Sequence, residues 1–102
     1  MAFEFMTPQE LAAELGSRLR NLRIRKMLDQ KELAARAGIS TRTLIMLEQG
    51  RGSTVETFLR VLKALDSLAG LDGLAPTPTI SPIAMMKAGR LPQRVVKKRP
   101  KE

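Results

Sequence analysis

The chain has 102 residues, with 18 Lys or Arg against 10 Asp or Glu and no His, Cys, Trp or Tyr. This length fits one small domain with a tail, and the lack of His and Cys removes the commonest general bases, nucleophiles and zinc ligands. We therefore expect no enzyme activity, no metal and no cofactor. No apolar run approaches the roughly 20 residues that span a bilayer, and the absence of Cys fits a reducing cytoplasm.

The first predicted helix begins at Pro8 and extends to about Met27. Thr7 can cap it, Pro8 suits the first helical position, and Glu10 can return a hydrogen bond to the cap. Four leucines at helical spacing predict its buried side: Leu11, Leu15, Leu19 and Leu22. Gly16 interrupts this run, and a glycine inside a helix costs about 1 kcal/mol relative to alanine.

Residues 29–50 predict two short helices joined by a tight turn. Asp29 and Glu32 have the spacing of a capping box at the start of the first of these helices. Gly38 ends that helix at a position suited to a positive φ. Ala34 is small enough for the two helices to cross closely. This arrangement is a helix-turn-helix, a motif that places its second helix in the major groove of DNA.

The second helix of the motif is predicted between a cap at Ser40 and a stop at Gly50. Apolar residues at helical spacing predict its buried face: Ile39, Leu44 and Leu47. The opposite face carries four candidate base contacts, Thr41, Arg42, Ile45 and Met46. Arg42 can bond guanine bidentately, and Thr41 can offer its hydroxyl or its methyl group. The alternatives are a solvated charge at Arg42 and incidental exposure of Ile45 and Met46.

A fourth helix is predicted from Ser53 or Thr54, and a short fifth helix from Ser67 to about Leu71. Five apolar positions form the predicted stripe of the fourth helix: Val55, Phe58, Leu59, Leu62 and Leu65. The prolines in 75–80 exclude a helix there, because each one pushes the preceding residue towards extended geometry.

The expected fold class is all-α, a compact five-helix bundle containing a helix-turn-helix, followed by a Pro-rich spacer and a basic C-terminal tail. The expected organisation is an N-terminal extension (1–6), a DNA-binding domain (7–74), and a third segment (75–102) with the spacer, a short helix at 82–88 and the tail. Residues 87–102 hold seven basic side chains and one acidic one. This tail is a DNA-backbone arm, a partner-docking segment or a solubilising end, and charge alone does not separate these readings.

From Leu15 to Leu65 the sequence resembles the Xre family of Cro- and phage-repressor-like helix-turn-helix domains. The resemblance rests on segments 19–23, 28–34, 47–51 and 55–58. Asp29 replaces the usual Ser, and Ser53 or Thr54 stands where the family has Pro. The resemblance implies a five-helix bundle that binds double-stranded palindromic operator DNA as a homodimer in the cytoplasm, associated with the nucleoid.

The resemblance also implies roles for residues around the motif. Gln30 matches a phosphate-contacting position at the start of a helix, where the helix dipole favours an anion. Three further phosphate candidates flank the third predicted helix or lie in its first turn: Ser40, Thr43 and Arg51. Arg23 and Glu48 match a partly buried structural ion pair, in which each charge requires the other.

A narrower resemblance concerns the segment after the domain. A Pro-rich spacer followed by Ser81-Pro82-Ile83 and Met86 is similar to HipB-type antitoxin regulators. Such proteins repress their own operon and bind a HipA-like kinase toxin. The alternative is a stand-alone phage-like or host transcriptional regulator without a toxin partner.

Overall fold

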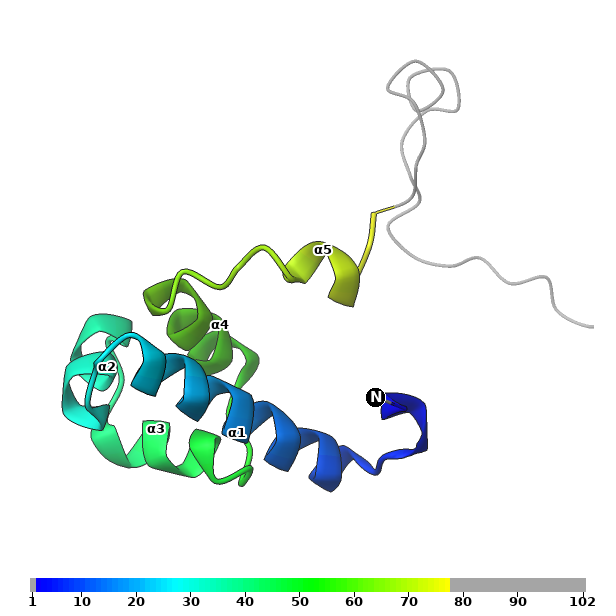
Figure 1. Ribbon diagram of the computed structural model, residues 1–102, viewed down its shortest axis with the longest axis horizontal. Coiled ribbons are helices and arrows are strands. Elements are labelled where there is room, and N and C mark those ends of the chain that lie inside the picture. The colour runs from blue at the N-terminus through cyan, green and yellow to red at the C-terminus, as the bar shows by residue number, and fades with distance from the viewer. Residues whose placement is uncertain (1, 78–102) are drawn as a thin grey trace, which may run out of the picture. The chain divides into compact units, whose positions relative to one another are not determined.

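The computed structural model describes residues 2–77, which belong to two units, Met1–Leu71 and Asp72–Glu102. The first unit contains a short 3-10 helix and four α-helices: η1 (Phe3–Phe5), α1 (Pro8–Arg25), α2 (Gln30–Ala37), α3 (Thr41–Glu48) and α4 (Val55–Ala64) (Figure 1). A fifth α-helix, α5 (Leu71–Leu74), begins at its last residue. Residues 2–77 include no strand, so the predicted all-α class with five α-helices is confirmed. The predicted helix at 82–88 and the basic tail lie outside the described residues.

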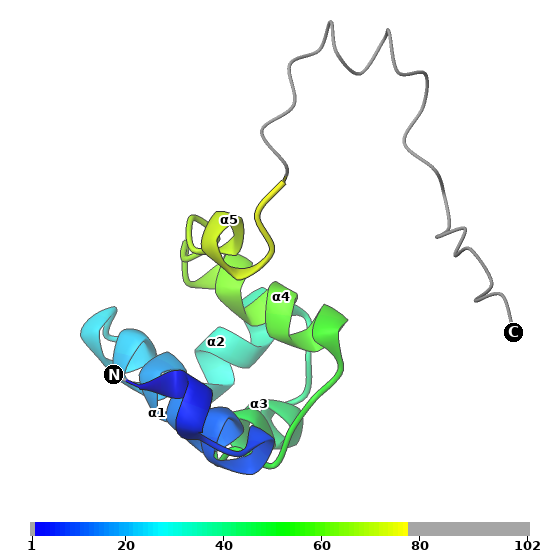
Figure 2. The ribbon, with the colours of Figure 1, turned by 90° about the vertical axis from the view of Figure 1, so that its right-hand side faces the viewer.

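Helix α2 packs against both α3 and α4, and α1 packs against α3 (Figure 2). Leucine and alanine dominate the core between these helices: Leu19, Leu28, Leu33, Ala34, Ala37, Leu44, Leu47, Val61, Leu62 and Leu65. The aromatic Phe58 lies only at the edge of this core. In the described residues, no helix combines the length and apolarity needed to cross a membrane.

The helices begin at the caps that the sequence predicts. Both capping boxes are present, Thr7 with Glu10 and Asp29 with Glu32. Ser40 caps α3, and Thr54 rather than Ser53 caps α4. Each cap gives a hydrogen-bond partner to a backbone N–H that the first helical turn leaves unpaired.

Helices α1 to α4 share one C-terminal motif, in which the chain turns through a residue of positive φ. These residues are Met27, Gly38, Gly50 and Asp66. The amide of the following residue then donates to a carbonyl five positions earlier, over 2.9–3.2 Å, in each of four pairs: Leu28 to Arg23, Ile39 to Ala34, Arg51 to Met46 and Ser67 to Leu62. This is the Schellman arrangement, which satisfies the last carbonyls of a helix. Glycine suits the turn at two helices, whereas Met27 and Asp66 adopt it with a side chain.

The predicted buried stripes need correction at their N-terminal ends. Leu11 and Leu15 are each 37% exposed, and Val55 is 72% exposed. Leu15 and Val55 border a shallow pocket of about 220 Å³ instead of filling the core. The stripe of α4 missed Val61, which is fully buried. Helical spacing predicts which side of a helix faces the core, but it does not show that Leu15 and Val55 face an open pocket there.

The position of the fifth helix was also wrong. The sequence predicted it from Ser67 to about Leu71, but the helix occupies Leu71–Leu74. After α4 the chain turns through the positive φ of Asp66, and residues 68–71 then form a turn in which the Leu71 amide donates to the Leu68 carbonyl. Leu71 packs against the core of the first unit.

Candidate nucleic-acid interface

Helix α3 presents its polar first turn to solvent and its apolar side to the core. Leu44 and Leu47 are buried, whereas Thr41 and Arg42 are exposed. The division follows from the helical period, because residues three apart lie on the same side of a short helix. Thr41 and Arg42 are therefore free to contact a ligand from the N-terminal end of α3.

Ile45 and Met46 lie one turn further along α3 and are half-buried. Their side chains are thus neither fully outward, as the sequence pattern suggested, nor part of the core cluster. Each one leaves part of its apolar surface accessible beside the exposed first turn. This position is compatible with a contact to a thymine methyl group.

Ser40 and Thr43 form a hydroxyl pair at the start of α3. The Ser40 Oγ accepts from the Thr43 amide over 3.0 Å and lies 2.7 Å from the Thr43 Oγ1. One hydroxyl donates to the other, so the pair keeps one O–H that is not used within the pair. That donor lies at the positive end of the α3 dipole, which suits an anionic oxygen.

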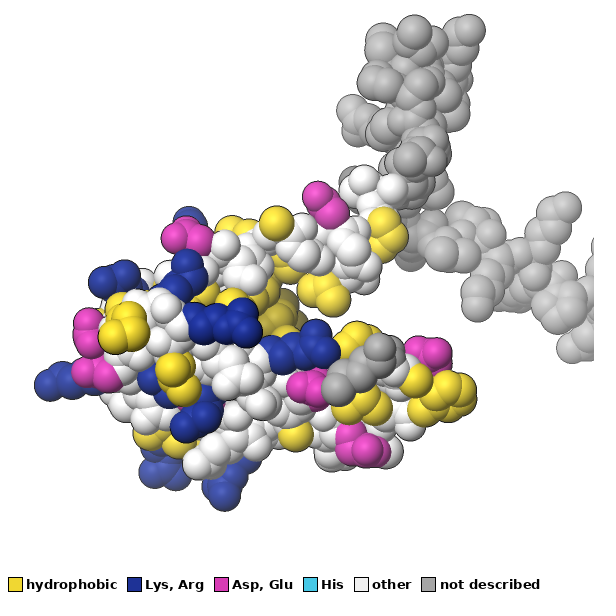
Figure 3. All heavy atoms as spheres, in the orientation of Figure 1, with side chains coloured by type: hydrophobic (Ala, Val, Ile, Leu, Met, Phe, Trp, Pro, Cys, Tyr) yellow, Lys and Arg dark blue, Asp and Glu magenta, His cyan; other side chains and the backbone are white. Residues whose placement is uncertain are grey.

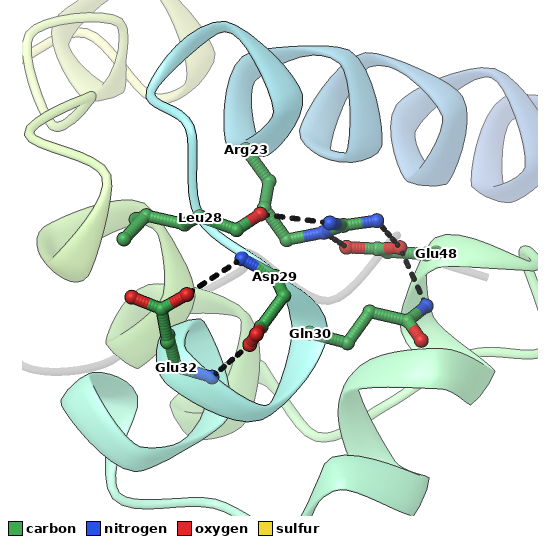
Figure 4. Close-up of polar contacts among 6 residues, drawn as sticks. All are labelled: Arg23, Leu28, Asp29, Gln30, Glu32 and Glu48. Atoms are coloured by element: carbon green, nitrogen blue, oxygen red, sulfur yellow. Dashed lines mark hydrogen bonds and ion pairs between the residues drawn. The ribbon is translucent and has the colours of Figure 1, made fainter.

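The ion pair between Arg23 and Glu48 joins α1 to the end of α3 (Figure 4). The Arg23 Nε donates to the Glu48 Oε2 over 2.7 Å, and its Nη2 donates to Oε1 over 3.2 Å. The Arg23 Nη1 donates to the Leu28 carbonyl over 2.9 Å. The side chains are 9% and 2% exposed, so both charges are buried and need these partners. Within residues 2–77, no buried side-chain nitrogen or oxygen lacks a hydrogen-bond partner.

Gln30 attaches α2 to the same network. Its Nε2 donates to the Glu48 Oε1 over 3.1 Å, and its side chain lies below the carboxylate in the view of Figure 4. Gln30 is half-buried, so part of it remains accessible at the start of α2. This side chain therefore links the orientation of α2 to the end of α3.

Arg51 is exposed just beyond α3, after the turn at Gly50. It lies at the opposite end of α3 from the Ser40–Thr43 hydroxyl pair. The phosphate candidates thus occupy both ends of α3 and the start of α2. In the space-filling view, Lys and Arg side chains gather mainly over the end of the first unit where α2 lies, whereas apolar side chains are prominent near η1 (Figure 3).

Two glycines hold α1 against the end of α3, and the sequence reading missed this role. A Cβ at Gly16 would lie 2.4 Å from the Leu47 carbonyl oxygen and 2.6 Å from that of Glu48. A Cβ at Gly50 would lie 2.5 Å from the Ala13 Cα. Backbone atoms cannot move aside as a flexible side chain can, so both positions need glycine. The sequence showed Gly16 only as a helix interruption, without its partner.

A second missed contact involves the N-terminal extension. The Arg18 guanidinium lies over the Phe3 ring, 5.0 Å from its centroid. This cation–π geometry connects η1 to α1. A phenylalanine in an unassigned segment gives no sequence signal for its partner.

Comparison with protein families finds that the helix-turn-helix model HTH_3 matches residues 19–71. The matched region begins in α1, includes α2, α3 and α4, and ends at the first residue of α5. It therefore contains the Arg23–Glu48 pair and the exposed first turn of α3. A search of the curated proteins finds no match.

Proposed function

Because this chain belongs to the Xre-type helix-turn-helix family of DNA-binding transcriptional regulators, which are typically not enzymes, we propose that it is a sequence-specific repressor of transcription. In this proposal, α3 enters the major groove of an operator. Arg42 and Thr41 read base edges, and Ile45 and Met46 contact thymine methyl groups.

One observation carries this proposal: the exposed first turn of α3 on a helix whose other side is fixed in the core. Thr41 and Arg42 are exposed, while Leu44 is completely buried. Base reading requires a helix held in a fixed orientation with polar side chains at its N-terminal end. The Arg23–Glu48 ion pair and the Gln30 hydrogen bond hold the other end of α3.

The proposed phosphate contacts surround this reading turn. They come from Gln30 at the start of α2, from the Ser40–Thr43 hydroxyl pair and from Arg51 beyond α3. Phosphate contacts fix register and orientation, but carry no sequence information directly. Under this proposal, the flanking groups position the domain and α3 supplies the specificity.

We also propose that the repressor acts as a homodimer on a palindrome. One eight-residue helix reads only a few base pairs, and two copies related by a two-fold axis would read two half-sites about 34 Å apart. Repression would follow if the operator overlaps a promoter, because the bound dimer would exclude polymerase.

Selection from a random duplex library tests this function. The expected result is an enriched palindrome, bound by the purified chain at physiological salt. The Arg42→Ala variant should bind that palindrome about 1–3 kcal/mol more weakly, while its affinity for a scrambled duplex hardly changes. Arg20→Ala, an exposed change on α1, provides the control of equal charge. Equal losses on both duplexes would show that Arg42 contacts only phosphate.

A more specific version of the proposal makes this regulator the antitoxin of a HipA-like toxin–antitoxin operon. Its support is the sequence of residues 75–89, a Pro-rich spacer followed by Ser81-Pro82-Ile83 and Met86. Most of this segment lies outside the described residues. The competing version is a stand-alone regulator without a toxin. The test is the neighbouring reading frame and its product. A frame that encodes a HipA-like kinase, with a product that co-purifies with this chain, would support the antitoxin. A neighbouring frame that encodes no such kinase would favour the stand-alone regulator.

A further inference from the structure

Helices α2 and α4 border an open groove of about 760 Å³, to which α3 contributes no lining residue. Leucines from α4 and from the segment that follows it provide much of its apolar lining: Leu59, Leu68 and Leu71. Leu68 is 39% exposed, and Leu59 is half-buried. The groove therefore offers accessible apolar surface outside the proposed DNA interface.

Three cations and one carboxylate also line this groove: Arg36, Arg60, Lys63 and Glu56. Arg60 pairs with Glu56, whose carboxylate lies 3.0 Å from the Arg60 Nη2. For Arg36 and Lys63, the described part of the chain offers no acidic side chain within ion-pair distance. Both residues lie in the last turn of a helix, where the carbonyl dipoles favour a cation. The helix dipoles explain why cations stand at these two positions. They do not explain why accessible leucines lie beside the cations.

We propose that this groove binds an acidic amphipathic segment of a partner protein. Apolar side chains of that segment would cover Leu59 and Leu68, and its carboxylates would face Arg36 and Lys63. An amphipathic helix in an apolar groove with charged rims is an established mode of peptide recognition. The inference goes beyond operator binding, because it concerns a different surface and does not depend on base recognition.

Charge argues against two other occupants. The chain's own residues 87–102 hold seven basic groups and one acidic group, which the cationic rim would repel. A second copy that met this groove through its own groove would bring two Arg36 and two Lys63 side chains together, because a two-fold interface pairs a surface with itself. Like charges at short distance oppose such a contact.

Fluorescence anisotropy with one defined peptide tests the proposal. The probe is a labelled amphipathic peptide of about four helical turns, with Leu on one face and Glu on the other. A peptide of the same composition with shuffled Leu positions is the control. The full-length chain is compared with Arg36→Glu/Lys63→Glu and with Arg20→Glu/Arg25→Glu, a matched double reversal of exposed charges on α1. Thermal melting verifies that both variants fold.

We expect the amphipathic peptide to bind the parent chain and the α1 variant similarly, and the groove variant at least tenfold more weakly. Leu68→Ser should also weaken binding. No binding at about 1 mM peptide, equal binding of the shuffled peptide, or equal losses in both charge variants would overturn the proposal. A dimer that the groove variant dissociates in sedimentation would also overturn it, since a second copy would then be the occupant. Operator binding, measured separately, should be unchanged in the groove variant. If the repressor proposal fails, the parent chain itself binds no operator. If the groove proposal fails, only the peptide titrations depart from expectation.

Discussion

Arg23 and Leu28 are joined by two hydrogen bonds of opposite direction. The Leu28 amide donates to the Arg23 carbonyl over 3.2 Å, and the Arg23 Nη1 donates to the Leu28 carbonyl over 2.9 Å. The first bond belongs to the helix-ending motif of α1, and the second belongs to the buried network around Glu48. The turn between α1 and α2 is therefore fixed by the same arginine that holds the end of α3.

Glu48→Ala should lower the free energy of unfolding by about 3–5 kcal/mol. The change leaves the Arg23 guanidinium buried with only the Leu28 carbonyl as a partner, and an uncompensated buried charge is costly. Urea denaturation followed by circular dichroism measures the effect. Glu48→Gln retains one acceptor oxygen and should lose less. A denaturation midpoint close to that of the parent chain would show that solvent replaces the ion pair.

Gly16→Ala should destabilise the domain, although the same change stabilises an exposed helix by about 1 kcal/mol. The new Cβ would collide with the backbone carbonyls of Leu47 and Glu48, and overpacking of this kind costs about 1–3 kcal/mol. Gly70→Ala is the matched control, because nothing lies within 4 Å of its added Cβ. Thermal melts of the two variants provide the comparison. A higher melting temperature for Gly16→Ala would show that α1 and α3 separate easily.

Met27→Gly should stabilise the domain by roughly 0.5–1 kcal/mol. Met27 has a φ of 59°, in the left-handed region, and is 88% exposed. Its side chain therefore makes few packing contacts that could offset the backbone strain. Relief of that strain exceeds the added entropy of glycine in the unfolded chain. Met27→Ala keeps the strain and should show no comparable gain. Urea titration measures both variants, and an unchanged or lower stability of Met27→Gly would contradict the strain argument.

Arg51→Ala should weaken binding to all duplex sequences alike. If Arg51 neutralises one phosphate, its loss should reduce the slope of log affinity against log salt by about 0.9 for each DNA-bound copy. Titrations of the operator and of a scrambled duplex at several salt concentrations measure this slope. Arg42→Ala is the contrasting variant, because its effect should depend on sequence. An unchanged slope for Arg51→Ala would remove Arg51 from the phosphate contacts.

Local sequence signals predicted the helix boundaries well. The capping boxes at Thr7 and Asp29 and the turn at Gly38 each depend on a few neighbouring residues, and all are present. The end of α1 was less accurate, because the left-handed turn falls on Met27, a residue type that gives no such signal. The same difficulty applies to Asp66 and displaced the predicted fifth helix.

Contacts between distant segments were harder to predict. Burial of Leu11 and Leu15 was expected from periodicity, but periodicity does not show where the neighbouring layer ends. The Gly16 contact depends on the crossing of α1 and α3, which only the folded arrangement reveals. The Arg23–Glu48 pair was expected only from the family resemblance. The proposed DNA contacts remain predictions, and the structure adds which of these side chains are exposed.

The network around Glu48 has a calorimetric consequence for DNA binding. Arg23, Gln30 and the Leu28 carbonyl already connect α1, α2 and α3 in the free chain. Residues 2–77 then have little left to fold when α3 docks, so the heat-capacity change should match rigid burial of the contact surface. Coupled folding would give a much larger negative value. The described domain should thus meet DNA with its reading surface already formed.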